Sequence, residues 1–103
     1  MLLIVIPSEL ADMDSNQQQN IDRARRDLAQ RLGIDETEIA VDSTEQAEFP
    51  DAALGAPEKG EMSAQVITDG WRIRMMANGK PYEYRANARQ LRLLNFNGEN
   101  YRV

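Results

Sequence analysis

The sequence predicts an α+β domain, with one amphipathic helix packed on a four- to five-stranded antiparallel sheet. Three observations support this fold class: an apolar stripe with helical spacing, a later change to two-residue alternation, and an Asn-Gly dipeptide between two alternating segments. A helix and a sheet with one apolar face each must cover one another, which gives two layers. The length of 103 residues suits a single domain with one modest core.

The chain begins with the short apolar run MLLIVI, followed by Pro7. The run lacks the basic start, the longer apolar core and the cleavage site of a secretory signal. It is also shorter than the roughly 20 residues that cross a membrane. We expect residues 1–14 to form a strand or a tail before a single domain over 15–103, and we expect no membrane insertion. A start left by the removal of a leader is the alternative.

The helix is predicted to begin at Ser15, which together with Gln18 makes an S-x-x-Q capping box. Apolar residues then follow at spacings of three, four and four, which places them on one face of the helix. These residues are Ile21, Ala24, Leu28 and Leu32. Gly33 is typical of a left-handed C-cap, so the sequence marks both ends of the helix.

Beyond the helix, apolar residues recur at every second position. One strand is predicted from about Glu38 to Phe49, with a bulge near Thr44 where polar residues interrupt the alternation. The segment SAQVIT, residues 63–68, is predicted as a second strand, and Asp69-Gly70 as the turn that follows it.

The dipeptide Asn78-Gly79, between two alternating segments, is the strongest short-range signal for a two-residue type I′ hairpin. Such a turn fixes the register of the two strands and puts their apolar and aromatic residues on one face. That face holds Trp71, Ile73, Met75, Tyr82, Tyr84 and Ala86. We expect Trp71 to be buried against the helix, opposite Ala86. A last strand over QLRLLNF and a turn at Asn97-Gly98 complete the sheet.

The other face of this hairpin is rich in arginine. The predicted register places Arg74 opposite Glu83, which is favourable, but it places Arg72 opposite Arg85. Like charges directly opposite each other are destabilising unless an anionic group lies nearby. The face is therefore either a solvated surface or a surface that binds an acidic partner.

The segment EFPDAALGAPEKGEM, residues 48–62, combines prolines and glycines with apolar residues. On a structural interpretation it is a compact loop in which Pro50 ends the strand, Asp51 caps a turn and Leu54 fills the edge of the core. Pro57 then stiffens the middle of the loop. On a functional interpretation it is a binding loop, because irregular loops of this length often bind partners.

Composition excludes several classes of function. The chain has no cysteine and no histidine, so it lacks a thiolate nucleophile, the commonest general base and the commonest metal ligand. It also lacks a calcium-binding D-x-D-x-D-G loop and a phosphate-binding glycine loop. We therefore expect no enzyme activity, no catalytic residue, no metal and no cofactor.

Charge is distributed unevenly along the chain. Residues 1–60 hold 13 acidic and 5 basic residues, whereas residues 61–103 hold 4 acidic and 7 basic residues. The net charge of −5 argues against nucleic acid as a partner, because binding to phosphates requires positive charge. A local basic face in the second part of the chain is compatible with this balance.

A series of short motifs resembles an uncharacterised bacterial domain. The motifs are Phe49-Pro50-Asp51, Leu54-Gly55, Pro57, Gly60 and Gly70-Trp71-Arg72-Ile73, closed by a Tyr-x-Tyr strand. The resemblance covers about residues 21–96, and the order of elements also resembles PepSY-like modules of bacterial exported proteins. Ala56 stands where such relatives have the cysteine of a Leu-Gly-Cys-Pro motif. The resemblance implies the fold, a cell-envelope setting and a role in inhibiting or regulating a partner, but no enzymatic activity.

We expect a non-enzymatic interaction or regulatory module that binds another protein through an exposed sheet face and the loop over 50–62. The alternative is a binder of a small anionic ligand on the arginine face. The candidate binding residues are Arg72, Arg74, Arg85, Asp51, Leu54 and Pro57. The sequence leaves the oligomeric state open.

Overall fold

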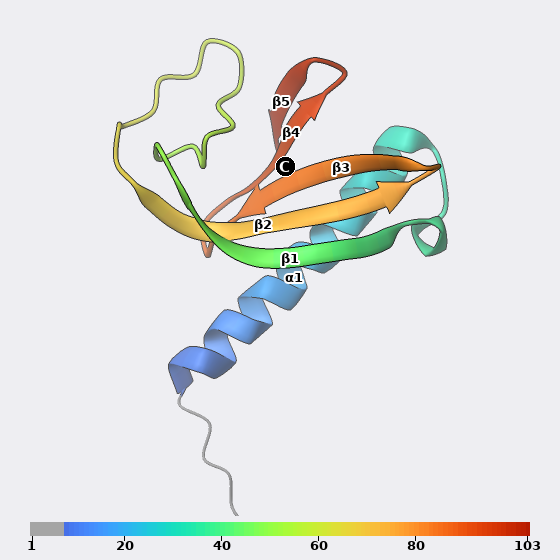
Figure 1. The fold of residues 1–103 in the computed structure, drawn as a ribbon, viewed down its shortest axis with the longest axis horizontal. Helices are drawn as coiled ribbons and strands as arrows, with labels where there is room; N and C mark the ends of the chain where they lie inside the picture. Colours follow the sequence, from blue (N-terminus) through green and yellow to red (C-terminus); the bar gives the residue numbers. More distant parts are fainter. Residues whose placement is uncertain (1–7) are drawn as a thin grey trace, which may run out of the picture.

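The computed structural model describes the backbone of residues 8–103 and the side chains of residues 17–103. One helix, α1 (Ser8–Leu32), packs on a five-stranded antiparallel sheet (Figure 1). The strands are β1 (Ala40–Phe49), β2 (Thr68–Ala77), β3 (Lys80–Ala86), β4 (Leu91–Phe96) and β5 (Glu99–Arg102). Their order in space follows their order in the chain. The predicted α+β fold class is confirmed.

The helix starts earlier than predicted. It begins at Ser8 and not at Ser15, so the predicted cap at Ser15 is wrong. Residues 8–14 contain no proline or glycine and include good helix formers, so nothing in them stops the helix. The first part of α1 therefore extends beyond the sheet (Figure 1). A strand or tail was predicted for residues 1–14. Residues 1–7 of this range lie outside the described residues, and residues 8–14 belong to α1.

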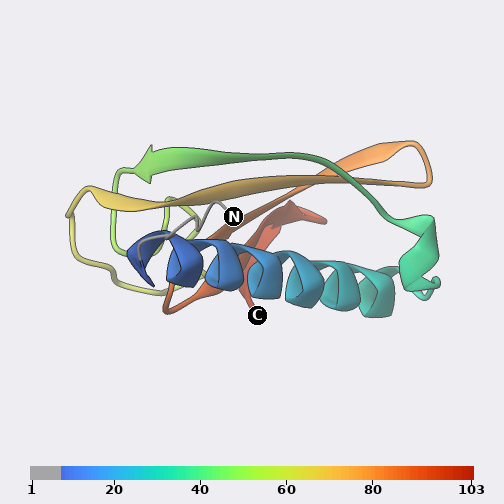
Figure 2. The ribbon, with the colours of Figure 1, turned by 90° about the horizontal axis from the view of Figure 1, so that it is seen from below.

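The main core lies between α1 and one face of the sheet (Figure 2). On the helix, Ala24 and Leu28 are completely buried, and Ile21 and Leu32 pack against the core at its margin, as the spacing predicted. The buried cluster consists of Ala24, Leu28, Ala29, Ile39, Ile73, Met75, Ala77, Tyr84, Ala86, Leu91 and Leu93. Gly33, with φ of 68°, ends the helix as predicted.

The β2–β3 hairpin has the predicted register. Asn78 and Gly79 form its turn with φ of 52° and 75°, and Arg72 lies opposite Arg85. Trp71 lies opposite Ala86, also as predicted, but it is only half-buried. The predicted burial of Trp71 is wrong because the β2–β3 ladder ends at this pair, and the Trp71 side chain lies outside the main core cluster to which Ala86 belongs.

A bulge in β1 changes which face its side chains occupy. The register shifts between Val41 and Ser43, close to the bulge predicted near Thr44. Before the bulge, Val41 packs against the main core; after it, Thr44 accepts a hydrogen bond from Gln17 of α1. Phe49 then lies on the opposite face of the sheet, beneath arginine side chains of β2 and β3. β1 thus supplies an apolar side chain to each face of the sheet, Val41 on the helix side and Phe49 on the other.

The connection between β1 and β2, residues 50–67, is irregular throughout. The strand predicted over residues 63–68 is wrong, and the turn predicted at Asp69-Gly70 lies inside β2. The ladder between β1 and β2 begins only at the pair Phe49 and Thr68, so residues 63–67 face no partner strand. Instead, the carbonyl of Ala64 accepts a hydrogen bond from the amide of Ala52 within the same loop.

Candidate functional site

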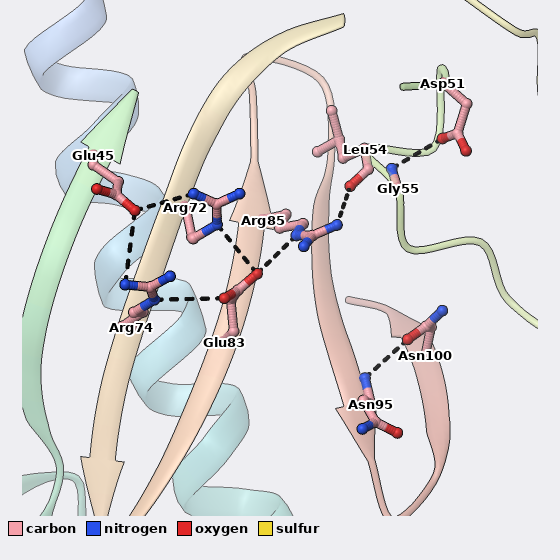
Figure 3. Close-up of polar contacts among 10 residues, drawn as sticks. All are labelled: Glu45, Asp51, Leu54, Gly55, Arg72, Arg74, Glu83, Arg85, Asn95 and Asn100. Carbon is pink, nitrogen blue, oxygen red and sulfur yellow. Dashed lines mark hydrogen bonds and ion pairs between the residues drawn. The ribbon is translucent and has the colours of Figure 1, made fainter. Parts of the chain in front are cut away.

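The arginine face consists of Arg72 and Arg74 on β2 and Arg85 on β3, and Glu83 lies among all three (Figure 3). The Glu83 carboxylate lies 2.8 Å from Nε of Arg85, 3.4 Å from Nε of Arg72 and 3.5 Å from Nε of Arg74. Glu45 on β1 adds a second carboxylate, 3.0 Å from Arg72 and 3.8 Å from Arg74. Arg72 and Arg85 lie opposite each other and require a negative charge nearby. Glu83 and Glu45 of the same chain supply it.

The arginine face is partly covered as well as partly neutralised. The exposed fraction of the side chain is 48% for Arg74, 26% for Arg72 and 16% for Arg85. The guanidinium carbons of Arg85 and Arg72 lie 5.0 and 5.8 Å from the centre of the Phe49 ring, within cation–π range. Only Arg74 presents about half of its side chain to solvent.

A second apolar cluster lies on this face, beneath the loop. Phe49, Ala53, Leu54 and Ala56 are all buried, and none of them belongs to the main core cluster. Leu54 is completely buried, and its carbonyl accepts a hydrogen bond of 3.0 Å from Arg85. The candidate residue Leu54 is therefore directed into the protein and is not available at the surface.

Asp51 organises the start of the loop. One carboxylate oxygen accepts hydrogen bonds of 2.9 Å from the amides of both Ala53 and Gly55. The bond from Gly55 is drawn in Figure 3. These bonds hold a tight turn in which Leu54 and Gly55 have φ of 58° and 67°. A carboxylate that binds its own loop in this way is a turn-forming group. The candidate residue Asp51 thus shapes the loop.

The middle of the loop is tied to β4 and β5. Arg92, whose side chain is only 3% exposed, forms hydrogen bonds of 2.6 and 2.8 Å to the two carboxylate oxygens of Glu61. The pKa of Glu61 is lowered to about 2, chiefly by the hydrogen bond from Arg92. The candidate residue Pro57 is half-buried, and its carbonyl accepts a hydrogen bond from Asn100. Residues 51–61, the inner segment, are therefore held against the sheet.

Sequence reasoning did not predict the pairing of Glu61 with Arg92. The structure places Arg92 opposite Arg85 in the β3–β4 ladder. A second pair of opposed arginines, if the β3–β4 register had been predicted, would have indicated that another carboxylate was needed nearby. The position of Glu61 depends on the path of the loop, for which the sequence has no periodic signal.

The outer segment, residues 62–67, has the opposite character. Met62 is 96% exposed, Ile67 71% and Val66 56%. No charged residue lies between Glu61 and Asp69, and the segment runs back to β2 along the outside of the loop (Figure 1). The exposed apolar residues therefore lie mostly downstream of the predicted binding loop over 50–62.

Acidic side chains adjoin the end of the outer segment. Glu48 on β1 lies directly opposite Asp69 on β2, and both residues are exposed. Among the side chains that the structure describes, neither residue forms an ion pair. The result is a small acidic surface that begins two residues after Ile67.

The fold and this surface define the chain as a small α+β domain in which a long loop covers part of the sheet face that faces away from the helix. Within residues 8–103, no helix combines the length and apolar character that crossing a membrane requires. The chain belongs to a family described as "Domain of unknown function (DUF8738)", which matches residues 21–94. No curated protein and no solved structure matches the chain. The expected relation to an uncharacterised small domain is thereby confirmed.

Proposed function

We propose that this domain is a non-enzymatic interaction module that binds another protein through its outer segment. The main support is the exposure of Met62, Val66 and Ile67 on six consecutive residues. Soluble domains seldom display clustered large apolar side chains unless these contact a partner. The Glu61–Arg92 pair and the start of β2 fix the two ends of the segment. The segment is thus presented in a defined position, which reduces the entropy that binding must overcome.

The backbone of the outer segment offers amides to a partner chain on either side of a tight turn, in which the Val66 amide donates a hydrogen bond of 3.0 Å to the Ala64 carbonyl. Among the described residues, no hydrogen-bond acceptor lies within reach of the amides of Ser63 and Gln65. Val, Ile and Thr, which favour strands, form the end of the segment. The main chain of a partner segment can therefore supply hydrogen bonds to these amides while its side chains contact Val66 and Ile67.

The charge beside the outer segment indicates the chemistry of the partner. Glu48 and Asp69 have no ion pair among the described side chains, and they lie opposite each other at the start of β2, directly after the outer segment. We expect the partner strand to be apolar in the middle and to carry lysine or arginine at its end, because opposite charges favour association and set its direction. The resemblance to PepSY-like modules of bacterial exported proteins supports the further proposal that binding regulates the partner in the cell envelope.

The second candidate, binding of a small anionic ligand on the arginine face, has less support. Glu45 and Glu83 already neutralise most of the charge of Arg72, Arg74 and Arg85. An incoming anion must compete with carboxylates that the fold holds in place. Titration with sulfate and phosphate tests this alternative directly, through a saturable rise in the melting temperature.

Two synthetic peptides test the main proposal. Both contain the same alternating valine and threonine strand; one ends in lysines and the other in glutamates. We expect the lysine peptide to bind saturably and to bind more weakly as salt is added. A triple variant, Met62→Ser with Val66→Thr and Ile67→Thr, should lose most of this binding without a change in stability. Gln30→Ala, an exposed change on α1, is the matched control and should bind like the unaltered domain.

Three results oppose the proposal. Equal binding of both peptides removes the role assigned to Glu48 and Asp69. Unchanged binding by the triple variant removes the outer segment as the binding surface. Concentration-dependent dimerisation that the triple variant abolishes identifies a second copy of this chain as the occupant and excludes the proposed partner.

A further inference from the structure

A separate cavity of about 300 Å³ lies beside Trp71, away from the arginine face. It is open to solvent and is lined by α1, by the beginning of β2 with its neighbour β1, and by the turn between β3 and β4. The cavity forms because the β2–β3 ladder ends at Trp71 and Ala86, after which β3 turns away while β2 remains paired with β1. Its lining includes Asn20, Gln46, Asp69, Trp71, Asn87 and Arg89.

The helix side of the cavity is polar and fixed. Asn20 occupies the same helix face as Ala24 and Leu28, but it continues the apolar stripe with an amide. It is only 7% exposed, and its Nδ2 donates a hydrogen bond of 3.1 Å to the carbonyl of Asn87. The Asn87 side chain in turn accepts hydrogen bonds from the amide of Arg89, at 2.8 Å, and from that of Gln90, at 3.0 Å. The turn that forms one wall is thus preorganised.

The other walls combine one aromatic ring with groups of both charges. Trp71 is half-buried and contributes an indole outside the main core cluster. Asp69 and Arg89 are exposed, and neither forms an ion pair among the described side chains. Gln46 supplies a further amide from β1. The cavity therefore offers hydrogen-bond donors and acceptors around one apolar surface, with no excess of either charge.

We infer that this cavity binds a neutral saccharide, with one sugar ring stacked on Trp71. A pyranose ring has an apolar C–H face that matches an indole, and a rim of hydroxyl groups that both donate and accept hydrogen bonds. Amides, a carboxylate and a guanidinium are the complementary groups for such a rim. A few placed polar groups around an apolar surface are also the usual composition of small-ligand sites, and the volume suits one ring. Asp69 disfavours an anion and Arg89 disfavours a cation.

Trp71 is the only tryptophan of the chain, so its fluorescence reports directly on the cavity. The probes are glucose, N-acetylglucosamine and their β-1,4-linked disaccharides. Sorbitol serves as a polyol without a ring, and alanine as a zwitterion without hydroxyls. We expect at least one ring sugar to change the emission saturably and sorbitol and alanine to leave it unchanged. The site does not depend on the outer segment, so the triple variant at Met62, Val66 and Ile67 should bind the same sugar.

Variants at exposed lining positions locate the site. Gln46→Ala and Asp69→Asn should each weaken sugar binding about tenfold or more, the effect of losing about 1.4 kcal/mol of hydrogen bonding. Arg74→Gln, on the opposite face of the sheet, is the control and should bind normally. Trp71→Phe should reduce binding as measured by ligand-observed NMR, while urea unfolding shows that the domain remains folded. Absence of binding by every ring sugar overturns the inference, as does binding of alanine in their place or unaltered binding by both lining variants.

Discussion

Arg92 on β4 and Glu61 in the loop are joined by two hydrogen bonds, of 2.6 and 2.8 Å. Arg92 also lies opposite Arg85 in the β3–β4 ladder. The loop carboxylate therefore neutralises one of two opposed strand arginines, and it does so where the Arg92 side chain is only 3% exposed. A buried guanidinium without a partner is costly, so the inner segment is an integral part of the fold.

The Glu61–Arg92 pair makes stability depend on pH in the acid range. The pKa of Glu61 falls from 4.5 to about 2 on folding, so the pair stabilises the domain fully above pH 4.5 and loses this effect as the pH falls towards 2. At pH 7, Glu61→Gln should lower the free energy of unfolding by about 2 kcal/mol, less than the full shift implies because Glu61 is 25% exposed. Urea unfolding at several pH values measures this difference.

The same measurement contains its own control. The difference between the unaltered domain and Glu61→Gln should be constant above pH 5 and should shrink towards zero near pH 2, because protonated Glu61 resembles glutamine. A difference that stays the same across this range shows that the pair contributes no charge-dependent stability.

Arg72 and Arg85 lie opposite each other but should differ in their effect on stability. Arg85 bonds to the carbonyl of Leu54 and to Glu83, and it lies over the Phe49 ring. Arg85→Gln should therefore destabilise the domain by about 1–3 kcal/mol. Arg72→Gln should cost less than about 1 kcal/mol, because exposed ion pairs contribute little. Thermal or urea unfolding that gives equal losses for the two variants contradicts the contact between Arg85 and the loop.

Alanine substitutions at two glycines of the loop distinguish the cost of backbone strain from the cost of steric crowding. Both have positive φ, 67° at Gly55 and 81° at Gly60. A Cβ at Gly55 would lie 2.6 Å from Nη1 of Arg85, whereas a Cβ at Gly60 would have no neighbour within 4 Å. Gly60→Ala should cost about 1 kcal/mol from strain alone, and Gly55→Ala about 2 kcal/mol or more. Equal melting temperatures for the two variants would contradict the close contact between the backbone at Gly55 and the Arg85 side chain.

The helix packing can be tested with one buried and one exposed position. Leu28 is completely buried in the main core, whereas Gln30 on the same helix is exposed. Leu28→Ala should lower the free energy of unfolding by about 2–4 kcal/mol, since it removes buried apolar volume and leaves a cavity. Gln30→Ala should change it by no more than about 0.5 kcal/mol. A loss of only a few tenths for Leu28→Ala places that helix face outside the core.

The parts of the fold that the sequence predicts well are those that local geometry determines. The Asn78-Gly79 turn admits essentially one register, so the pairs along β2 and β3 follow from the chain alone. The apolar spacing from Ile21 to Leu32 likewise identifies the helix face that packs on the sheet. At the other end of the helix, no residue from Ser8 to Asp14 acts as a stop, and a single favourable capping box did not determine where the helix begins.

The parts that were predicted poorly depend on contacts between distant segments. Residues 63–68 have the composition of a strand, but β1 ends at Phe49 and leaves residues 63–67 no partner. Trp71 has the alternation of a core residue, yet it belongs to the last pair of the β2–β3 ladder, where the covering of the sheet ends. In the same way, the inward direction of Asp51 and Leu54 depends on hydrogen bonds and burial that no periodic pattern encodes.

The long connection between β1 and β2 has a consequence for how this family can diversify. The two strands pair from Phe49 and Thr68 as far as Ala40 and Met76, so their register does not depend on the length of the chain between them. Closing a longer loop costs only about 0.6 kcal/mol for each doubling of its length. Residues 62–67 can therefore be lengthened or replaced by selection while the helix and sheet stay unchanged. Relatives can in this way present different side chains at this position on one scaffold.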